Sequence, residues 1–275
     1  MSSEADRKLA SFRNPPLHEV ALSVQFESVA ALTIAHVGKF WHDIRDRFPL
    51  VQEQPALSSP AIERDAARID NQELVIGPVP PRARLWLLDS ERRELIQIQH
   101  DRFIRNWRKT GGDDRYPRYD EHIRPRFESD YRAFCDFVRG EGFGDIQASQ
   151  CEVSYFNRIP VAAPVWRSFA DMHKVFCLYS PVDAGPLPIT AEGLQWRQSF
   201  AISRGAEFTG RLYTEITPAV VNGEPVIRYD LTVRGHSESG SVTDTMAFLD
   251  LGRRLIVEYF ARSTSSDMHQ VWERE

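Results

Sequence analysis

One stretch of the sequence, LIQIQHDRFIRNWRK, brings together residue types that could recognise a polar or charged ligand. Amide side chains donate and accept hydrogen bonds, and guanidinium groups form paired bonds to carboxylates or phosphates. An aromatic ring beside them could stack on a planar group. The candidate ligand- or partner-binding residues are Gln97, Gln99, Asp101, Arg102, Asn106, Trp107 and Arg108.

The segment Arg102–Arg126 extends this pattern with further arginines and aromatic rings, which could hold a phosphate, a nucleotide or an acidic peptide. Acidic residues such as Asp101 and Asp120 dilute its positive charge. A structural role is equally natural, with Trp107 and Tyr116 fixing the loop while its arginines pair with nearby aspartates. Nucleic-acid binding through this segment is therefore the third of three functional hypotheses.

Strand periodicity assigns faces to the opening stretch. Over a strand from Glu94 to Ile104, one face would carry Gln97, Gln99, Asp101 and Phe103, and the other Ile96, Ile98, His100 and Ile104. Polar residues of other expected strands match the amide face in kind, namely Ser23, Gln25, Arg211, Glu215, Arg228, Asp230 and Arg234. If all project from the uncovered side of one sheet, they form a broad binding surface. A solvated face held by cross-strand pairs, such as Arg211 with Glu215, is the alternative.

The sequence lacks the usual catalytic signatures, including zinc-binding His-Glu-x-x-His, Gly-x-Ser-x-Gly and a Walker loop. The stretch RGEGFGD follows an expected helix and precedes a strand, which is the reverse of a dinucleotide-binding loop, so we interpret it as a helix end and turn. The three cysteines, Cys135, Cys151 and Cys177, lie in apolar surroundings typical of buried thiols. We expect no catalytic residue, metal ligand or cofactor, and a binding protein rather than an enzyme.

The amino-acid composition limits the classes of protein to which the chain could belong. The chain has 275 residues, of which 42% are hydrophobic, which is enough for a folded core. A net charge of −5 disfavours a protein whose main role is non-specific nucleic-acid binding. No apolar run reaches the length of a membrane span, and Met1–Arg13 is polar where a signal peptide would be apolar. We expect a cytoplasmic protein without membrane contact.

The first half of the chain predicts the order β-α-β-β-α. NPPLHEVALSVQFES alternates apolar and polar residues like a half-buried strand, and apolar residues from Val37 to Phe48 recur at helical spacing before Pro49. Residues 54–83 contain several prolines and read as a surface excursion, within which Leu74–Ile76 could form a short strand. The remaining expected elements are strands near Arg84–Asp89 and Glu94–Ile104, a turn at Gly111–Asp114, and a helix over Phe127–Val138 ending at Gly140.

The second half predicts the order β-α-β-β-β-α. Its first strand covers Gln150–Ile159, and a helix over Trp166–Phe176 follows, although HKVFCLY could equally be a strand. Asn222-Gly223 is a strong hairpin-turn signal. The other expected elements are strands over Gln195–Arg204, Phe208–Thr217 and Pro225–Arg234, and a long helix over Asp244–Arg262 capped by Thr243 or Asp244.

The two orders nearly coincide, which predicts an α+β fold of two pseudo-repeated halves of order β-α-β-β-(β)-α. We expect antiparallel sheet or sheets with helices packed on one face. The expected division is a polar leader of residues 1–13, a first half of residues 14–146 and a second half of residues 147–275, packed as one compact unit.

Four stretches, NPPLHEVALSVQFE, IQIQHDRFIRNWRK, VSYFNRI and FLDLGRRLIVEYFARSTSSDMHQVWER, together resemble a sporadically distributed bacterial family of uncharacterised proteins. The resemblance spans nearly the whole chain and includes the Asn-Pro-Pro start of the first strand. It implies a family-wide feature at Asp101, Arg102, Phe103, Asn106, Trp107 and Arg108, and assigns that feature no role. The patchy distribution suggests an accessory or defence-related bacterial gene cluster.

Two further hypotheses concern function. The first is a binding or interaction protein that uses the candidate residues of the opening stretch. The alternative is a small-molecule binding protein or enzyme with a ligand between a curved sheet and the C-terminal helix, supplied with aromatic residues such as Trp196, Tyr213 and Tyr229. A cavity of about 300 Å³ or more between sheet and helix is the observation that this alternative requires.

Overall fold

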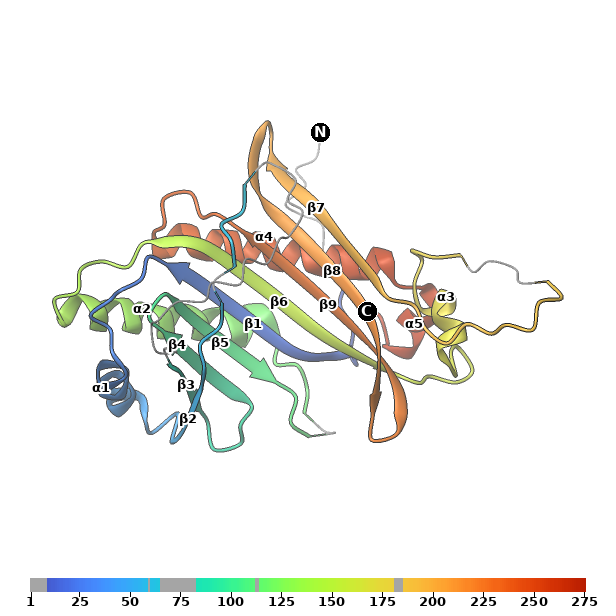
Figure 1. Cartoon of the computed structure of the whole chain (residues 1–275), viewed down its shortest axis with the longest axis horizontal. Helices are drawn as coiled ribbons and strands as arrows, with labels where there is room; N and C mark the ends of the chain where they lie inside the picture. The colour runs from blue at the N-terminus through green and yellow to red at the C-terminus, as the bar shows by residue number, and fades with distance from the viewer. Residues whose placement is uncertain (1–8, 59, 65–82, 112–113, 181–184) are drawn as a thin grey trace.

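A computed structural model describes residues 9–58, 60–64, 83–111, 114–180 and 185–275. Within these ranges the strands form one nine-stranded sheet in the order β2-β3-β4-β5-β1-β6-β9-β8-β7 (Figure 1), and every pairing between neighbours is antiparallel. The strands are β1 (Leu17–Phe26), β2 (Leu50–Pro55), β3 (Ala83–Leu88), β4 (Glu94–Gln99), β5 (Arg102–Arg108), β6 (Ala148–Pro160), β7 (Trp196–Arg204), β8 (Glu207–Val221) and β9 (Glu224–Gly235).

The helices are α1 (Ile34–Ile44), α2 (Arg124–Gly140), α3 (Met172–Val175), α4 (Val242–Ser263) and α5 (Ser266–Val271). A π-helical turn, Tyr119–Ile123, leads directly into α2, and a 3₁₀ turn, Phe169–Asp171, leads into α3. The expected α+β class with a large antiparallel sheet is confirmed. The internal pseudo-repeat and the packing of every helix on one face stay predictions.

The two halves of the chain meet at the centre of the sheet, where β1 pairs with β6. Leu22 of β1 lies opposite Val153 of β6, which in turn lies opposite Val233 of β9. The hydrogen-bonded ladder therefore crosses the boundary between the expected halves without interruption, so the halves share one continuous sheet.

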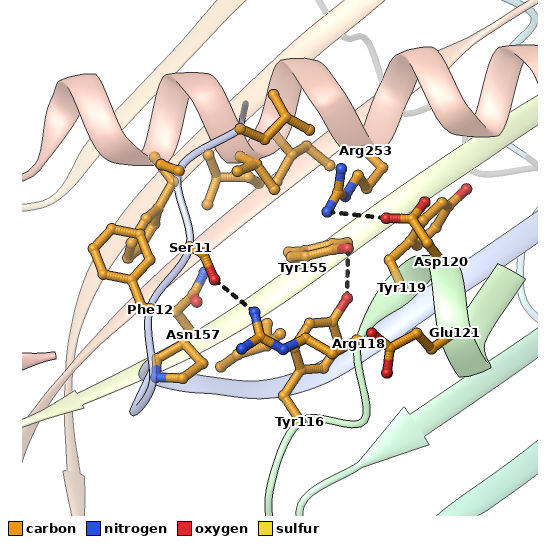
Figure 2. Close-up of a pocket in the computed structure, with 18 residues that line it drawn as sticks. Ser11, Phe12, Tyr116, Arg118, Tyr119, Asp120, Glu121, Tyr155, Asn157 and Arg253 are labelled. Carbon is orange, nitrogen blue, oxygen red and sulfur yellow. Dashed lines mark hydrogen bonds and ion pairs between the residues drawn. The ribbon is translucent and has the colours of Figure 1, made fainter. Parts of the chain in front are cut away.

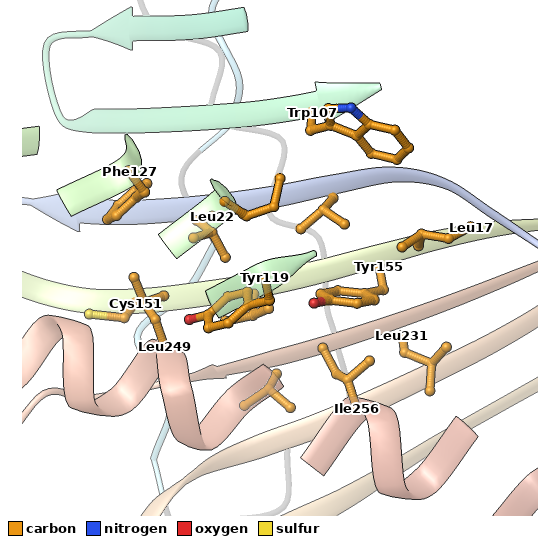
Figure 3. Close-up of a cluster of buried hydrophobic side chains, with 14 of the residues drawn as sticks. Leu17, Leu22, Trp107, Tyr119, Phe127, Cys151, Tyr155, Leu231, Leu249 and Ile256 are labelled. Carbon is orange, nitrogen blue, oxygen red and sulfur yellow. The ribbon is translucent and has the colours of Figure 1, made fainter. Parts of the chain in front are cut away.

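The apolar face of the sheet, defined by Leu22, Val24, Phe103, Val153 and Val233, contacts both long helices. Phe103 stacks on Phe134 of α2 with ring centroids 5.2 Å apart. A Cβ atom at Gly252 of α4 would lie only 2.9 Å from a methyl carbon of Val153, so glycine permits α4 to approach the strands closely. Figure 3 shows the buried side chains that fill this layer. Their alternation along each strand is the pattern from which the strands were predicted.

The polar face, defined by Ser23, Gln25, Gln99, Gln150 and Arg234, is crossed by the segment that leaves β2 (Figure 1). We call residues 56–58 and 60–64 the strap. Its backbone bonds to successive strands in their spatial order, from Gln99 of β4 through Gln25 of β1 to Gln150 of β6. Glu63 then reaches β8, where its carboxylate bonds to Arg211 at 2.5 Å and to Tyr213 at 2.6 Å.

Three sequence predictions of secondary structure are wrong. The expected strand Glu94–Ile104 is a hairpin, because the chain reverses at His100 and Asp101, whose carbonyls accept hydrogen bonds from Val29 and Phe26. Phe103 consequently shares a face with its cross-strand partner Ile98 and not with Gln99. The strand β2 was missed, and the expected helix Trp166–Phe176 contains only the short α3 and the turn before it.

The predictions of turns and helix caps are confirmed only in part. The Asn222-Gly223 turn forms as expected, with positive φ at both residues. The cap of α4 is Ser241, whose hydroxyl accepts from the backbone of Asp244, and not Thr243 or Asp244. Leu74–Ile76 and most of the expected excursion lie outside the described residues, as does part of the Gly111–Asp114 turn.

The described part of the expected polar leader packs against the end of the chain. The backbone nitrogen of Arg13 donates to Glu273 at 3.0 Å, and that of Asn14 donates to Trp272 at 3.1 Å. The ring of Phe12 lies edge-on to that of Phe260 in α4, with centroids 5.7 Å apart. Residues 9–12 thus lie beside α4 and close one side of the cavity described below. Among the described helices, none combines the length and apolar character needed to cross a membrane.

Candidate functional site

The structure buries Gln97 and Asn106, two of the residues predicted to bind a partner, in an internal hydrogen-bonded chain. Gln97 accepts from Arg84 at 2.6 Å and from Trp86 at 3.0 Å, and donates to Asn106 at 2.7 Å. Asn106 donates in turn to Glu19 at 2.6 Å. Both amide groups are therefore already used within the protein.

Gln99 and Arg102 bind the strap. Gln99 accepts from the backbone nitrogen of Leu57 at 3.0 Å and donates to its carbonyl at 3.1 Å, in the manner of a neighbouring strand. It also donates to Asp101 at 2.6 Å, and Arg102 donates to the carbonyl of Ser58 at 3.4 Å. With Gln99 only 2% exposed, the expectation that this part of the polar face is uncovered is wrong.

The register does place the other matching polar residues on the same face. Ser23, Gln25, Arg211 and Arg234 lie in rows that lead through their strand partners to Gln97 or Gln99, and Glu215, Arg228 and Asp230 lie at alternate positions of the same strands β8 and β9. The cross-strand pair imagined between Arg211 and Glu215 does not form, since Arg211 pairs with Glu63 of the strap and Glu215 with Arg197.

Trp107 and Arg108 point to opposite faces at the end of β5. Trp107 is buried with its ring edge-on to Tyr116, at 5.6 Å, which matches the structural alternative for this loop. Arg108 lies over the ring of Trp86 at 5.5 Å and donates to the carbonyl of Arg92 at 3.1 Å. That the seven candidate residues bind a partner stays a prediction.

A buried ionic cluster lies under α2 at Arg105. Its Nε donates to Asp130 at 2.7 Å and its terminal nitrogen to Glu94, which also contacts His122. Burial alone would raise the pKa of Glu94, but Arg105 and His122 outweigh it and the pKa lies below its usual value. Because its charges are matched internally, this cluster is better suited to fixing α2 on the sheet than to chemistry.

A cavity of about 450 Å³ lies between the sheet and α4. We call it the sheet–helix cavity. Its apolar walls include Leu231 of β9 and Ile256, Val257 and Phe260 of α4, and residues 9–12 close it on one side. Figure 2 shows the side chains that converge on it from β6, α4 and the segment before α2. The volume exceeds that required by the small-molecule hypothesis.

The lining of the sheet–helix cavity also includes polar and charged side chains, namely Ser11, Tyr116, Arg118, Tyr119, Asp120, Glu121, Tyr155, Asn157 and Arg253. The hydroxyls of Tyr116 and Tyr155 lie 3.1 Å apart. Burial raises the pKa of both phenols, so they are protonated and uncharged at neutral pH. Beside them Arg253 contacts Asp120 at 3.6 Å, while its Nε is buried without a hydrogen-bond partner among the described residues.

The backbone at the mouth of the cavity adopts an uncommon conformation. Arg118 has φ 71° and ψ 142°, a region that residues with a Cβ rarely occupy. The π-helical turn follows at once, with the nitrogen of Ile123 donating to the carbonyl of Arg118 at 3.3 Å. Asp250 of α4 fixes this turn by accepting hydrogen bonds from Tyr119 and Arg124, each at 3.0 Å. Such strain and π-helical turns are frequent at functional sites.

The aromatic residues expected around a ligand are not the ones found there. Tyr213 lies on the polar face with Glu63, and Tyr229 packs between Phe176 and Phe260. Sequence reasoning used Tyr116 only as a loop anchor and did not single out Tyr155 or Arg253. Tyr155 alternates with Val153 and Cys151 like an ordinary core position, so no sequence signal marked it.

No group of three or more His, Cys, Asp or Glu side chains in the described parts of the chain could hold a metal ion. In comparisons with known proteins, no family model, curated protein or solved structure matches this chain. The class of protein therefore has to be inferred from the cavity and its surroundings.

Proposed function

We propose that this is a small-molecule binding protein whose ligand occupies the sheet–helix cavity. The observation that carries the proposal is the cavity itself, whose volume of about 450 Å³ lies within the range of about 300–1,000 Å³ typical of ligand pockets. Its lining combines apolar side chains with polar ones such as Tyr116, Tyr155 and Arg253, and ligand pockets are usually built from both kinds.

The polar side chains of the cavity are evidence for a ligand that binds in one orientation. Arg253 supplies a cation, and because one of the phenols Tyr116 and Tyr155 donates to the other, one uncharged phenol hydroxyl remains as a free donor. A bound carbonyl, hydroxyl or anionic group would satisfy that donor. Strain at Arg118 adds support, because uncommon backbone conformations cluster at ligand-binding sites.

The test uses N-phenyl-1-naphthylamine, an uncharged apolar dye whose fluorescence rises in an apolar site. We expect the wild-type protein to bind it with a Kd of about 100 μM or tighter. Val257→Trp fills the cavity from α4 and should weaken binding at least about tenfold, which is a loss of about 1.4 kcal/mol.

A matched control is Arg254→Trp, which places the same new side chain at an exposed position of α4. This variant should bind the dye like the wild type. Ala10→Trp fills the same cavity from the other side and guards against misfolding of Val257→Trp, with circular dichroism checking both. Equal dye binding by the wild type and both filled variants would overturn the proposal.

Several broader expectations stay proposals beside this one. They are that the protein is bacterial and cytoplasmic, that it belongs to an accessory or defence-related gene cluster, and that its candidate residues on β4 and β5 contact a partner. The last would require the strap to leave the polar face, because Gln99 and Arg102 bind the strap backbone.

The strand order supports the proposed duplication. In each half the first strand lies at the centre of the sheet, the last strand lies next to it, and the others follow outward, giving β1-β5-β4-β3-β2 and β6-β9-β8-β7, so that β2 is an additional edge strand of the first half. A long helix follows the last strand in both halves, α2 in the first and α4 in the second. Superposition of residues 14–146 on residues 147–275 tests this, and a match of fewer than four strands would contradict it.

A further inference from the structure

A second cavity, of about 340 Å³, lies next to the first at the end of β6. We call it the basic pocket. Its walls come from residues 13–18, the segment after β5 and α5. The two cavities share the lining residues Pro15, Leu17 and Tyr116, so the cavities adjoin at these three residues.

The charged side chains around the basic pocket are mostly cationic. The cations are Arg13, Lys109, Arg115 and Arg158, set against the carboxylate of Asp114. Within the described residues, no ion pair involves the side chain of Lys109, Arg115 or Arg158. Arg13 alone has a carboxylate partner there, Glu273 at 3.3 Å.

Asp114 does little to neutralise these cations, because its carboxylate is already engaged. One oxygen accepts from the backbone nitrogens of Thr110 and Gly111, each at 2.8 Å, and the other pairs with Arg93 at 3.0 Å. The backbone bonds hold the pKa of Asp114 at about 2. The carboxylate of Asp114 thus stabilises the turn at Thr110.

Neighbouring carboxyl groups also have other partners. Glu19 accepts from Asn106, and Asp230 pairs with Arg228 at 2.7 Å. Burial raises the pKa of both carboxyls, although Arg158 acts in the opposite direction on each. Both carboxyls thus feel the charge of Arg158, but among the described residues neither forms an ion pair with it.

The lowered pKa of His18 reflects, beside its burial, the positive charges around it. Its pKa is lowered to about 4, first by burial and then by Arg158, Lys109 and Arg108. The ring is accordingly neutral near pH 7, and the positive character of the pocket comes from its lysine and arginine side chains. Several cations around a partly enclosed pocket of this size suit a compact anion such as a phosphate.

We propose that the basic pocket binds the phosphate group of a small amphipathic ligand whose apolar part occupies the sheet–helix cavity. The apolar half of this inference rests on the proposed function, while the phosphate half rests on the basic pocket alone. The three shared lining residues place the two halves of such a ligand next to each other. The ligand class is thus a phosphate ester of an apolar alcohol.

The experiment compares decyl phosphate with decanol as competitors of N-phenyl-1-naphthylamine. We expect decyl phosphate to displace the dye at a concentration at least about tenfold lower than decanol, since a phosphate held by arginine forms strong charge-assisted bonds. Lys109→Met combined with Arg158→Met should remove that advantage while leaving dye binding and displacement by decanol unchanged.

The matched control replaces two exposed cations elsewhere, Arg132→Met with Arg254→Met, and changes the net charge equally. It should keep the advantage of decyl phosphate. Equal displacement by the two competitors, with the dye still bound, would overturn this inference and leave the proposed function standing. Failure of the dye to bind at all would overturn the proposed function instead, and inorganic pyrophosphate then tests the basic pocket alone by calorimetry.

A polyanion is the other source of phosphate. Random single-stranded DNA should show no binding at about 100 μM in physiological salt, since Arg105 is matched by Glu94 and Asp130 and Arg102 is buried. Micromolar, salt-sensitive binding that the Lys109 and Arg158 replacements abolish would assign the pocket to nucleic acid and overturn the small-ligand proposal.

Discussion

The two faces of the sheet are both covered over much of their area, but by different means. On the apolar face, helices α2 and α4 pack through rings such as Phe103 and Phe134, and the fit leaves a cavity beside α4. On the polar face, the strap crosses the strands and its backbone is bonded by Gln25, Gln99 and Gln150. Side-chain polarity alone therefore does not distinguish the exposed side of a sheet from a side that is covered by backbone.

The comparison also shows where a ligand site can arise. The strap forms hydrogen bonds with the polar side chains beneath it, so these side chains have few free donors or acceptors for a ligand. Helix packing is less complete, because large side chains of α4 and the segment before α2 meet without filling the space between them. We therefore expect function on the apolar face, although the residues with the most evident chemistry lie on the other face.

Replacing Arg105 by Met should have the largest effect, and it tests how strongly the buried ionic cluster at Arg105 stabilises the packing on the apolar face. The change leaves Asp130, which is 1% exposed, without the partner at 2.7 Å. Loss of one partner from a buried ion pair costs about 3–5 kcal/mol. Urea unfolding measures the free energy, with Arg132→Met as the control because its pair with Glu128 is exposed and is worth about 0.5 kcal/mol. A loss for Arg105→Met no greater than the control would show that Arg47 alone compensates Asp130.

Replacing Gln150 by Leu should have an intermediate effect and tests the polar face. The change removes the acceptor for the backbone nitrogen of Glu63, now at 2.9 Å, and leaves that group unpaired under the strap. An unsatisfied buried group costs about 1–3 kcal/mol. We also expect faster proteolytic cleavage within residues 56–64, read by mass spectrometry, because the strap opens more often. Gln147→Leu, at an exposed position nearby, should change neither quantity, and the strap description fails if the two variants behave alike.

Acidification should have the smallest effect, through His18 of β1, which lines the basic pocket. Its pKa is about 4 in the folded protein against 6.5 ordinarily, so the unfolded chain binds a proton at a pH where the folded protein does not. The contribution of this group to stability is complete above pH 6.5 and is lost as the pH falls toward 4. His18→Gln should therefore lose less free energy of unfolding than the wild type between about pH 7 and about pH 5. The difference should shrink in high salt, since Lys109 and Arg158 contribute to the shift. An identical pH dependence of stability in the wild type and His18→Gln would contradict this prediction.

Much of the fold could be predicted because local patterns determine it. Val20, Leu22 and Val24 alternate with polar neighbours in β1, and Asn222-Gly223 specifies the turn between β8 and β9. The reversal at His100 and Asp101 was missed because these residues interrupt neither the alternation nor the polarity, and their turn is held by backbone bonds from Phe26 and Val29. The strand β2 was missed because Pro55 ends it and prolines follow.

The site was less predictable than the fold. Gln97, Gln99 and Asn106 were recognised as unusual, but nothing local shows that a distant backbone segment bonds to Gln99 or that Gln97 and Asn106 bond to each other. The sheet–helix cavity is assembled from Phe12, Tyr155, Arg253 and others that are far apart in sequence. Its existence depends on how well those side chains fill space, which is a property of the packed molecule.

The strap has a consequence for the order in which the molecule folds. Glu63 bonds to Arg211, Tyr213 and His236, which lie 148, 150 and 173 residues further along the chain. During synthesis these partners emerge long after Glu63, so the strap lacks its anchor until β8 and β9 exist and have joined the sheet. Contacts of such sequence separation close large loops and form slowly. We infer that docking of the strap is a late folding event, and that until it occurs the glutamines of β1, β4 and β6 are exposed to water and to other chains.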